Sequence, residues 1–258
     1  MLGLGNSLVS GSPSEQLYSV VCDGTGDYIS VGDDNALSFG DSSEDSALSI
    51  SLWYKTSDVT NQPLITKTGN LTNKREWYLS FGSNDKIYFG LFDDSTNVGV
   101  YVYTAALTST EDAWTHIAVT YDATEHPTGM KVYIDGTVVS VTAVDNASYV
   151  AMENTAYDVW IGGQQYSSAS LNGNIDEVAI FGAELDANAV NVIYNSGEPF
   201  DLTSDRTTGV KVYDNASDLV GYWRMNEGSG TTITDSSGNG NNGTLTADAA
   251  FSTDTPDD

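Results

Sequence analysis

The stretch WTHIAVTYDATEHPTGMKVYIDGTVV, residues 114–139, decides the fold of this chain. Apolar side chains recur at every second position in HIAVTY and again in KVYI, and this period of two is typical of half-buried β-strands. Asp135 and Gly136 follow KVYI, and an Asp-Gly pair between two such segments favours the positive φ angles of a tight hairpin turn. The stretch therefore predicts an antiparallel meander to which the rest of the chain adds further strands.

The composition suits a protein built of strands and turns. The 258 residues include 15 Tyr, 7 Phe, 5 Trp and 25 Gly. Aromatic side chains fit pleated, half-buried surfaces, glycine fits turns, and a chain of this length can bury a substantial core. We predict an all-β fold, an antiparallel two-sheet sandwich, with one short helix near residues 186–196. Asp186 can cap the start of this helix, and Gly197 can end it.

Several motifs, taken in order, resemble the laminin-G-type jelly roll of the concanavalin A-like lectin/glucanase superfamily. They are YSVVCDGTGDYISV at 18–31, ALSISLWYKT at 47–56, the meander at 114–139 and LNGNIDEVAIFGAEL at 171–185. The resemblance covers residues 17–197 and implies a concanavalin A-like jelly roll. Such a resemblance is far more specific for fold than for function, because one fold carries many functions.

The resemblance divides the chain into three parts. Residues 1–16 form either a docking arm or a linker, residues 17–197 form the sandwich, and residues 198–258 form a C-terminal extension. Within the extension, residues 219–245 resemble the opening of a second domain of the same type. Too few residues follow for a second sandwich, so we expect this hairpin to cover its apolar side chains by packing on the first one. Packing on a neighbouring subunit is the alternative.

The charge of the chain limits its partners. With 36 acidic and 9 basic residues, the formal net charge is −27. Nucleic-acid binding is disfavoured, because phosphate contacts need clustered Lys and Arg. The apolar runs are too short for a transmembrane helix, so we expect no membrane insertion. The acidic surface favours solubility and tolerance of salt, and it makes Ca²⁺ a candidate ligand.

A structural Ca²⁺ is the cofactor that the sequence favours most. Calcium prefers about six to eight oxygen ligands, often several carboxylates together with carbonyls of a tight turn. The opening turn supplies Asp23 and Asp27, and the family resemblance implies that Asp176 of the closing strand lies beside the opening strand. The alternative is that Asp23 and Asp27 only form Asx turns and that Asp176 accepts hydrogen bonds from backbone N–H groups.

The sequence contains no motif for catalysis. A retaining glycosidase needs two carboxyl groups about 5–5.5 Å apart, and no expected strand interior has Asp or Glu at positions i and i+2. Asp176 and Glu177 are adjacent, so they are expected to point to opposite faces of a strand. His116 and His126 accompany no Ser or Cys nucleophile motif, and Cys22 lies in an apolar run typical of a buried, inert thiol. We therefore expect no catalytic residues and no enzyme activity.

Aromatic and amide side chains mark the expected ligand surface. Aromatic rings stack on the apolar faces of sugars, while amide groups satisfy the sugar hydroxyls. The candidate ligand-binding residues are Trp77, Tyr78, Tyr103, Gln164 and Tyr166. For each aromatic residue the alternative is a place in the core or at the edge of a sheet.

A virion structural or display protein is the function that these observations favour, as a capsid decoration, fibre or tail component. The motifs resemble those of marine bacteriophage virion proteins, and residues 1–16 lack the basic and apolar segments of a signal peptide. Its partners would be other virion proteins or copies of itself, and its adhesion domain would bind cell-surface polysaccharide from the virion surface. The alternative is a free, extracellular carbohydrate-binding module or lectin, and a glycoside hydrolase is the least favoured class.

Overall fold

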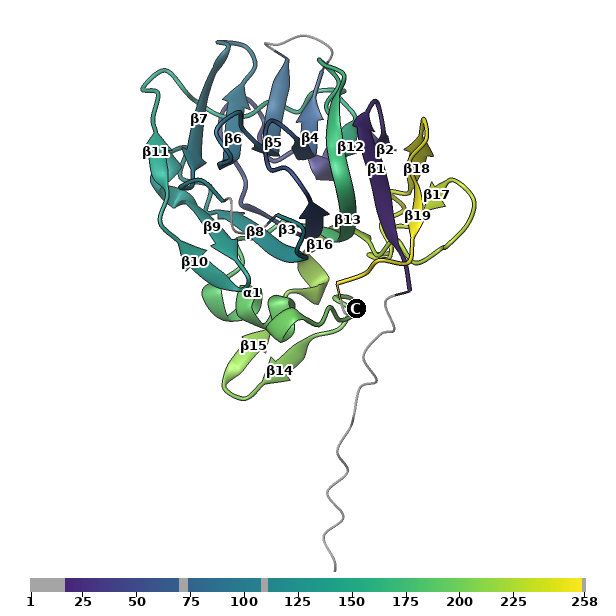
Figure 1. Ribbon diagram of the computed structural model, residues 1–258. Coiled ribbons are helices and arrows are strands. Elements are labelled where there is room, and N and C mark those ends of the chain that lie inside the picture. The colour runs from purple at the N-terminus through teal and green to yellow at the C-terminus, as the bar shows by residue number, and fades with distance from the viewer. Residues whose placement is uncertain (1–16, 70–73, 108–110, 257–258) are drawn as a thin grey trace, which may run out of the picture.

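The structure is a computed structural model that describes residues 17–69, 74–107 and 111–256. The predicted arm, residues 1–16, lies outside this range. Two antiparallel sheets pack face to face, and one short helix and a small hairpin lie below them in Figure 1. The structure confirms the predicted all-β, two-sheet jelly-roll sandwich with one short α-helix.

In the part of the chain that the structure describes, sheet A contains eight strands and is centred on β3 and β13. Its order is β10-β9-β8-β3-β13-β1-β19, with β16 also paired to β13. Asp135 and Gly136, with φ angles of 48° and 69°, form the predicted tight turn between β9 and β10. The strands are β1 (Ser19–Thr25), β3 (Leu48–Thr56), β8 (Thr115–Tyr121), β9 (Met130–Ile134), β10 (Thr137–Val139), β13 (Ala169–Phe181), β16 (Leu219–Trp223) and β19 (Ala250–Ser252).

Sheet B contains nine strands within the described ranges, in the order β11-β7-β6-β5-β4-β12-β2-β18-β17. Consecutive hairpins join β4 to β5, β5 to β6 and β6 to β7, so this half of the sheet is a simple meander. The strands are β2 (Tyr28–Gly32), β4 (Pro63–Thr68), β5 (Arg75–Phe81), β6 (Ile87–Asp93), β7 (Val98–Tyr103), β11 (Thr142–Val144), β12 (Val159–Ile161), β17 (Thr232–Ile233) and β18 (Gly243–Thr246).

The main core lies between the two sheets. Every second side chain of the central strands enters it, as the alternation in the sequence predicts; Ile50 and Leu52 of β3 and Ile117 and Val119 of β8 are fully buried. Cys22 also belongs to this core, and burial raises the pKa of its thiol to about 12. The thiol is therefore protonated and inert at neutral pH.

A third layer covers the outer face of sheet A. It consists of α1 (Ala187–Tyr194) and the hairpin of β14 (Arg206–Thr208) and β15 (Lys211–Tyr213). Asp186 caps the helix by accepting the Ala189 N–H at 2.7 Å, and the apolar side of the helix is buried. Short 3₁₀ turns lie at Asn35–Leu37, Pro127–Gly129, Asn195–Gly197 and Ala216–Asp218. No helix within the described ranges is long and apolar enough to cross a membrane.

The C-terminal extension adds strands to both sheets of the same sandwich. β16 pairs with β13 and β19 pairs with β1 in sheet A, while β18 pairs with β2 in sheet B. The Tyr222 and Trp223 side chains are fully buried as a result. The first and last described strands are neighbours, and the Ser19 hydroxyl donates to the Asp254 carbonyl at 2.7 Å.

Candidate functional site

The outer face of sheet B carries the candidate site. Residues directly opposite one another on neighbouring strands point to the same face of a sheet. One such row across β4, β5, β6 and β7 consists of Thr66, Tyr78, Gly90 and Tyr101, and the next row consists of Ser80, Tyr88 and Tyr103. The residues between them, such as Leu79 and Phe89, belong to the main core. The alternation of β5, β6 and β7 therefore directs several tyrosines outward.

We call Tyr78, Tyr88, Phe92, Tyr101 and Tyr103 the tyrosine face. All five side chains are partly exposed. The Tyr88 and Tyr103 rings stack with centroids 5.3 Å apart, and Tyr78 lies 5.7 Å from Phe92. Such ring contacts hold the side chains in place, so the face is ordered before any ligand arrives.

Gly90 sets the position of the Tyr78 ring. It lies opposite Tyr78, and a Cβ at this position would clash with the ring, so the ring lies against the bare backbone of β6. Glycine inside a strand often marks such a close approach. A Cβ at Gly82, directly after β5, would likewise clash with the ring of Tyr88. Two rings thus lie against the sheet, an arrangement suited to stacking on a flat ligand.

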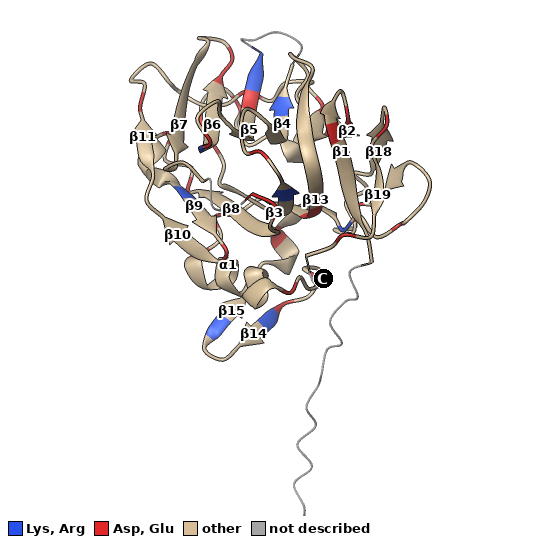
Figure 2. Cartoon of the chain, viewed as in Figure 1, with Lys and Arg blue, Asp and Glu red and all other residues tan. Residues whose placement is uncertain are grey.

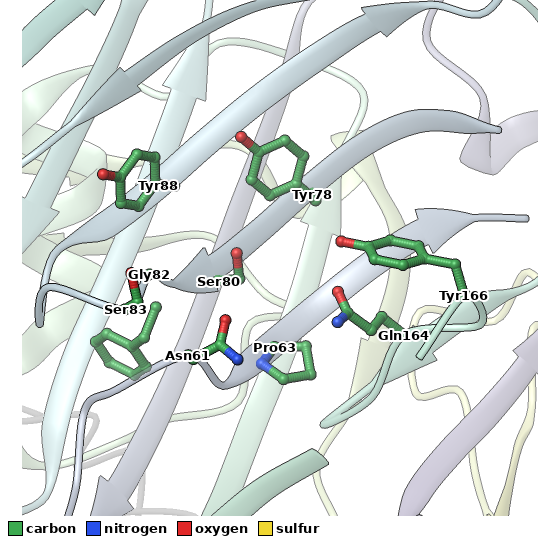
Figure 3. Close-up of a pocket in the computed structure, with 10 residues that line it drawn as sticks. Asn61, Pro63, Tyr78, Ser80, Gly82, Ser83, Tyr88, Gln164 and Tyr166 are labelled. Atoms are coloured by element: carbon green, nitrogen blue, oxygen red, sulfur yellow. The ribbon is translucent and has the colours of Figure 1, made fainter. Parts of the chain in front are cut away.

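A shallow pocket of about 230 Å³ adjoins the tyrosine face (Figure 3). Its lining residues are Asn61, Pro63, Tyr78, Ser80, Phe81, Gly82, Ser83, Tyr88, Gln164 and Tyr166. Gln164 and Tyr166 come from the loop between β12 and β13. Burial raises the pKa of the Tyr78 and Tyr166 hydroxyls, so both stay protonated at neutral pH and can donate a hydrogen bond. The lining thus combines aromatic rings with neutral amides and hydroxyls.

The structure brings together most of the residues predicted to bind a ligand. Tyr78, Gln164 and Tyr166 line the pocket, and Tyr103 lies on the tyrosine face against Tyr88. The prediction of Trp77 as a ligand-binding residue is wrong. Its side chain is fully buried in the core, and its Nε1 donates to the Leu37 carbonyl at 3.0 Å. Its ring has no face free for a ligand.

Tyr88, Tyr101 and Gly90 belong to the site but were not among the predicted ligand residues. The alternation in KIYFGLF and GVYVYT contains the signal, since each tyrosine there is flanked by core residues. The alternation does not reveal which residues lie opposite one another on neighbouring strands. This pairing register places Tyr88, Tyr101 and Gly90 in adjacent rows.

The predicted calcium ligands do not form one site. Asp23 accepts the backbone N–H of Thr25 at 2.8 Å, which is the Asx-turn alternative. Asp27 accepts the backbone N–H groups of Asp23 and Asp248, each at 2.9 Å. Asp23 lies opposite Asn172 on β13, and Asp176 lies about four residues further along, roughly 13 Å away. The described residues contain no group of three or more His, Cys, Asp and Glu side chains that could hold a metal ion. The acidic side chains around this turn therefore do not fit the expected calcium site.

A serine–histidine contact is present, but it is buried. Ser51 Oγ lies 2.8 Å from Nε2 of His116, and neither residue is accessible. Burial lowers the pKa of His116 to about 3, so the ring stays neutral. The ring of Tyr194 on α1 lies 5.9 Å from the imidazole. A substrate cannot reach this pair, and the contact is part of the packing beneath the helix.

Comparison with protein families identifies the group to which the chain belongs. Residues 23–191 match the laminin-G-type family model described as the concanavalin A-like lectin/glucanases superfamily. The chain is therefore a member of this superfamily. No match was found among curated proteins.

A solved structure with a TM-score above 0.5 shows the same fold at low sequence identity. A protein from Bacteroides ovatus ATCC 8483, to which carbohydrate binding is ascribed, is similar with a TM-score of 0.58 and 18% identity. The match covers 92% of this chain but only 60% of that protein. The receptor binding domain of the botulinum neurotoxin C/D mosaic serotype has a TM-score of 0.44 and 18% identity, over 58% of this chain and 36% of that one. The likeness to the Bacteroides ovatus protein concerns the fold alone.

Proposed function

We propose that this protein is a non-enzymatic carbohydrate-binding module whose sugar site is the tyrosine face with its adjoining pocket. The observation that carries the proposal is the row of partly exposed tyrosine rings beside a pocket of neutral amides and hydroxyls. Aromatic rings stack on the apolar C–H faces of sugars, and the amides and hydroxyls can pair with sugar hydroxyls. Membership of a superfamily of lectins and glucanases supports the carbohydrate-binding part of this proposal.

Binding without hydrolysis fits the chemistry of the pocket. Hydrolysis of a glycosidic bond normally needs two carboxyl groups on either side of the bond. The lining residues include neither Asp nor Glu. The pocket is also shallow and adjoins an open sheet face, so it suits one stretch of a longer glycan better than an enclosed small molecule.

Affinity electrophoresis through gels that contain single polysaccharides tests this proposal. We expect retardation of the native protein by at least one polysaccharide and its loss in the double variant Tyr78→Ala/Tyr88→Ala. Tyr194→Ala is the matched control, because this partly exposed tyrosine lies on α1, in the layer over the other sheet. Equal retardation of all three proteins would contradict the proposed site, and turnover of a polysaccharide would contradict the non-enzymatic assignment.

We further propose that the module is displayed on the surface of a virus particle, with a free extracellular lectin as the alternative. The support is the resemblance of its motifs to phage virion proteins and its acidic composition, 36 acidic against 9 basic residues. Light scattering and negative-stain imaging of the full chain and of a chain without residues 1–16 distinguish the two. Oligomers or particle binding that require residues 1–16 support display, and two well-behaved monomers contradict it.

A further inference from the structure

The nine basic residues of this chain differ in the kind of partner that they contact. Five of the nine form ion pairs with carboxylates: Lys55, Lys67, Lys74, Lys131 and Arg224. Three others lie over aromatic rings, namely Arg75, Lys86 and Arg206. Within the described residues, no ion pair involves any of these three. Two of the three, Arg75 and Lys86, stack on members of the tyrosine face.

From this arrangement we infer that the tyrosine face binds an acidic polysaccharide, with Arg75 and Lys86 contacting its carboxylate or sulfate groups. The inference rests on the proposed function and adds the chemical class of the glycan. Uncompensated positive charge is unusual on a chain with a net charge of −27, where Figure 2 shows far more acidic than basic segments.

Arg75 has the geometry of an anion-binding group. Its guanidinium carbon lies 3.6 Å from the centre of the Phe92 ring. Its Nε is buried and has no hydrogen-bond partner among the described residues, so an anion would contact the terminal amino groups. A guanidinium held flat on a ring still directs its N–H groups outward in its own plane, which matches the two oxygens of a carboxylate. The Phe92 ring lies 5.7 Å from the ring of Tyr78, which lines the pocket, so the guanidinium lies beside the pocket.

Neighbouring acids do not neutralise Arg75. Asp94 interacts with it electrostatically, but the ion pair of Asp94 is with Lys74, at 2.9 Å. The pocket lining contains no acidic residue at all. An anionic sugar next to Tyr78 would therefore meet a local positive charge despite the negative charge of the whole molecule.

Lys86 lies at the other end of the tyrosine face. Its ammonium group lies 4.5 Å from the centre of the Tyr103 ring. Arg75 begins β5, and Lys86 directly precedes β6, which runs back antiparallel to β5. The seven residues of β5 span roughly 20 Å, so the two cations flank the face along its strands. Charges so far apart suit an extended polymer with repeated acidic groups and not a single acidic sugar.

A matched pair of polysaccharides tests the inference, using polygalacturonate and its carboxyl-reduced, neutral form. The variants of the full chain are Arg75→Met and Lys86→Met, singly and together, since methionine keeps an apolar stem over the ring. Arg206→Met is the control, because Arg206 lies over Phe200 in the same way but on the covered side of the molecule. Chondroitin sulfate in parallel distinguishes sulfate from carboxylate recognition.

We expect the native protein to bind polygalacturonate at least tenfold more tightly than the reduced form in 50 mM salt, and this preference to shrink in 500 mM salt. Arg75→Met should lower this preference for polygalacturonate about fivefold or more, and the double variant should lower it further. Arg206→Met should leave the preference unchanged. A preference for chondroitin sulfate alone, lost in the same variants, supports the inference with sulfate as the recognised group. Equal affinity for acidic and neutral forms, or a preference unchanged in the double variant, would overturn the inference alone. Failure to bind any polysaccharide would overturn the proposed function with it.

Discussion

The outer faces of the two sheets carry similar side chains but differ in what covers them. Both carry aromatic side chains, Trp53 and Tyr133 on sheet A and Tyr78 and Tyr88 on sheet B. On sheet A, α1 and the segments after it cover these rings, and Trp53 and Tyr133 are at most 3% exposed. On sheet B, within the described ranges, the tyrosine rings remain partly exposed. An outward aromatic therefore stabilises the fold on one face and is free to bind on the other.

The chain segments after β13 make this difference. The closing strand leads directly into α1, whose apolar side, together with Phe200, Leu202 and Tyr213, forms a second hydrophobic cluster over sheet A. Among the described residues, the same extension reaches sheet B only through β17 and β18, at the edge opposite to the tyrosine meander. Apolar area that stays exposed in this way marks a binding surface more often than a defect in packing.

The largest effect should follow from truncating the covered face. Phe181→Ala removes a fully buried ring of sheet A that packs edge-on against Tyr213, and we expect a loss of about 3–5 kcal/mol in the free energy of unfolding. Tyr101→Ala on the open face should cost less than about 1 kcal/mol, because its ring is already partly hydrated. Urea denaturation of both variants measures the contrast. Equal losses would show that the open face is as structural as the covered one.

A buried glutamate beside the open face should give stability a dependence on pH. Burial raises the pKa of Glu76 to about 7 although Lys67 lies nearby and opposes the shift. The pKa of Glu76 in the folded state lies above its value in the unfolded state. The contribution of Glu76 to the stability of the fold is therefore fully present below about pH 4.5 and is lost as the pH rises through 7. Between pH 5 and 8, the free energy of unfolding of Glu76→Gln should therefore fall by roughly 3 kcal/mol less than that of the native protein.

Unfolding measured at several pH values tests the Glu76 prediction. Glu198→Gln, at an exposed position, serves as the control and should leave the pH profile unchanged. Burial raises the pKa of Glu177 on the covered side as well, so some slope should persist in Glu76→Gln. A profile identical to that of the native protein would contradict the role of Glu76.

A smaller but more specific effect should come from Gly90→Ala. The added methyl displaces the Tyr78 ring, so we expect about tenfold weaker polysaccharide binding, or roughly 1.4 kcal/mol. A double-mutant cycle with Tyr78→Ala gives the control: once the ring is absent, the Gly90 substitution should cost no further affinity. Additive losses from the two substitutions would mean that Gly90 acts through something other than the position of this ring.

The smallest effect concerns calcium. The Asp27 carboxylate already accepts two backbone N–H groups, and Asp176 lies elsewhere on β13. We therefore expect EDTA to change neither the melting temperature nor polysaccharide binding by a measurable amount. A stabilisation of several degrees by Ca²⁺ that disappears in Asp23→Asn would restore the calcium site.

The sequence was sufficient for the local elements and for part of the site. The period of two predicts the central strands, Asp135 and Gly136 predict the turn, and Asp186 predicts the helix start. The same period cannot tell which of two adjacent aromatics faces inward, so it predicts both Trp77 and Tyr78 as ligand residues. That choice depends on where the second sheet lies. The cross-strand register that gathers Tyr78, Gly90 and Tyr101 likewise depends on pairing between strands.

The measurement that tests the central claim most directly is an NMR titration of protein labelled with ¹³C in its tyrosine rings, using polygalacturonate fragments. We predict shifts for Tyr78, Tyr88, Tyr101, Tyr103 and Tyr166 and none for Tyr213 or Tyr222, which are buried on the covered face. Assignment by single Tyr→Phe variants identifies each signal. Binding that shifts tyrosines elsewhere and leaves the tyrosine face unchanged would contradict the account.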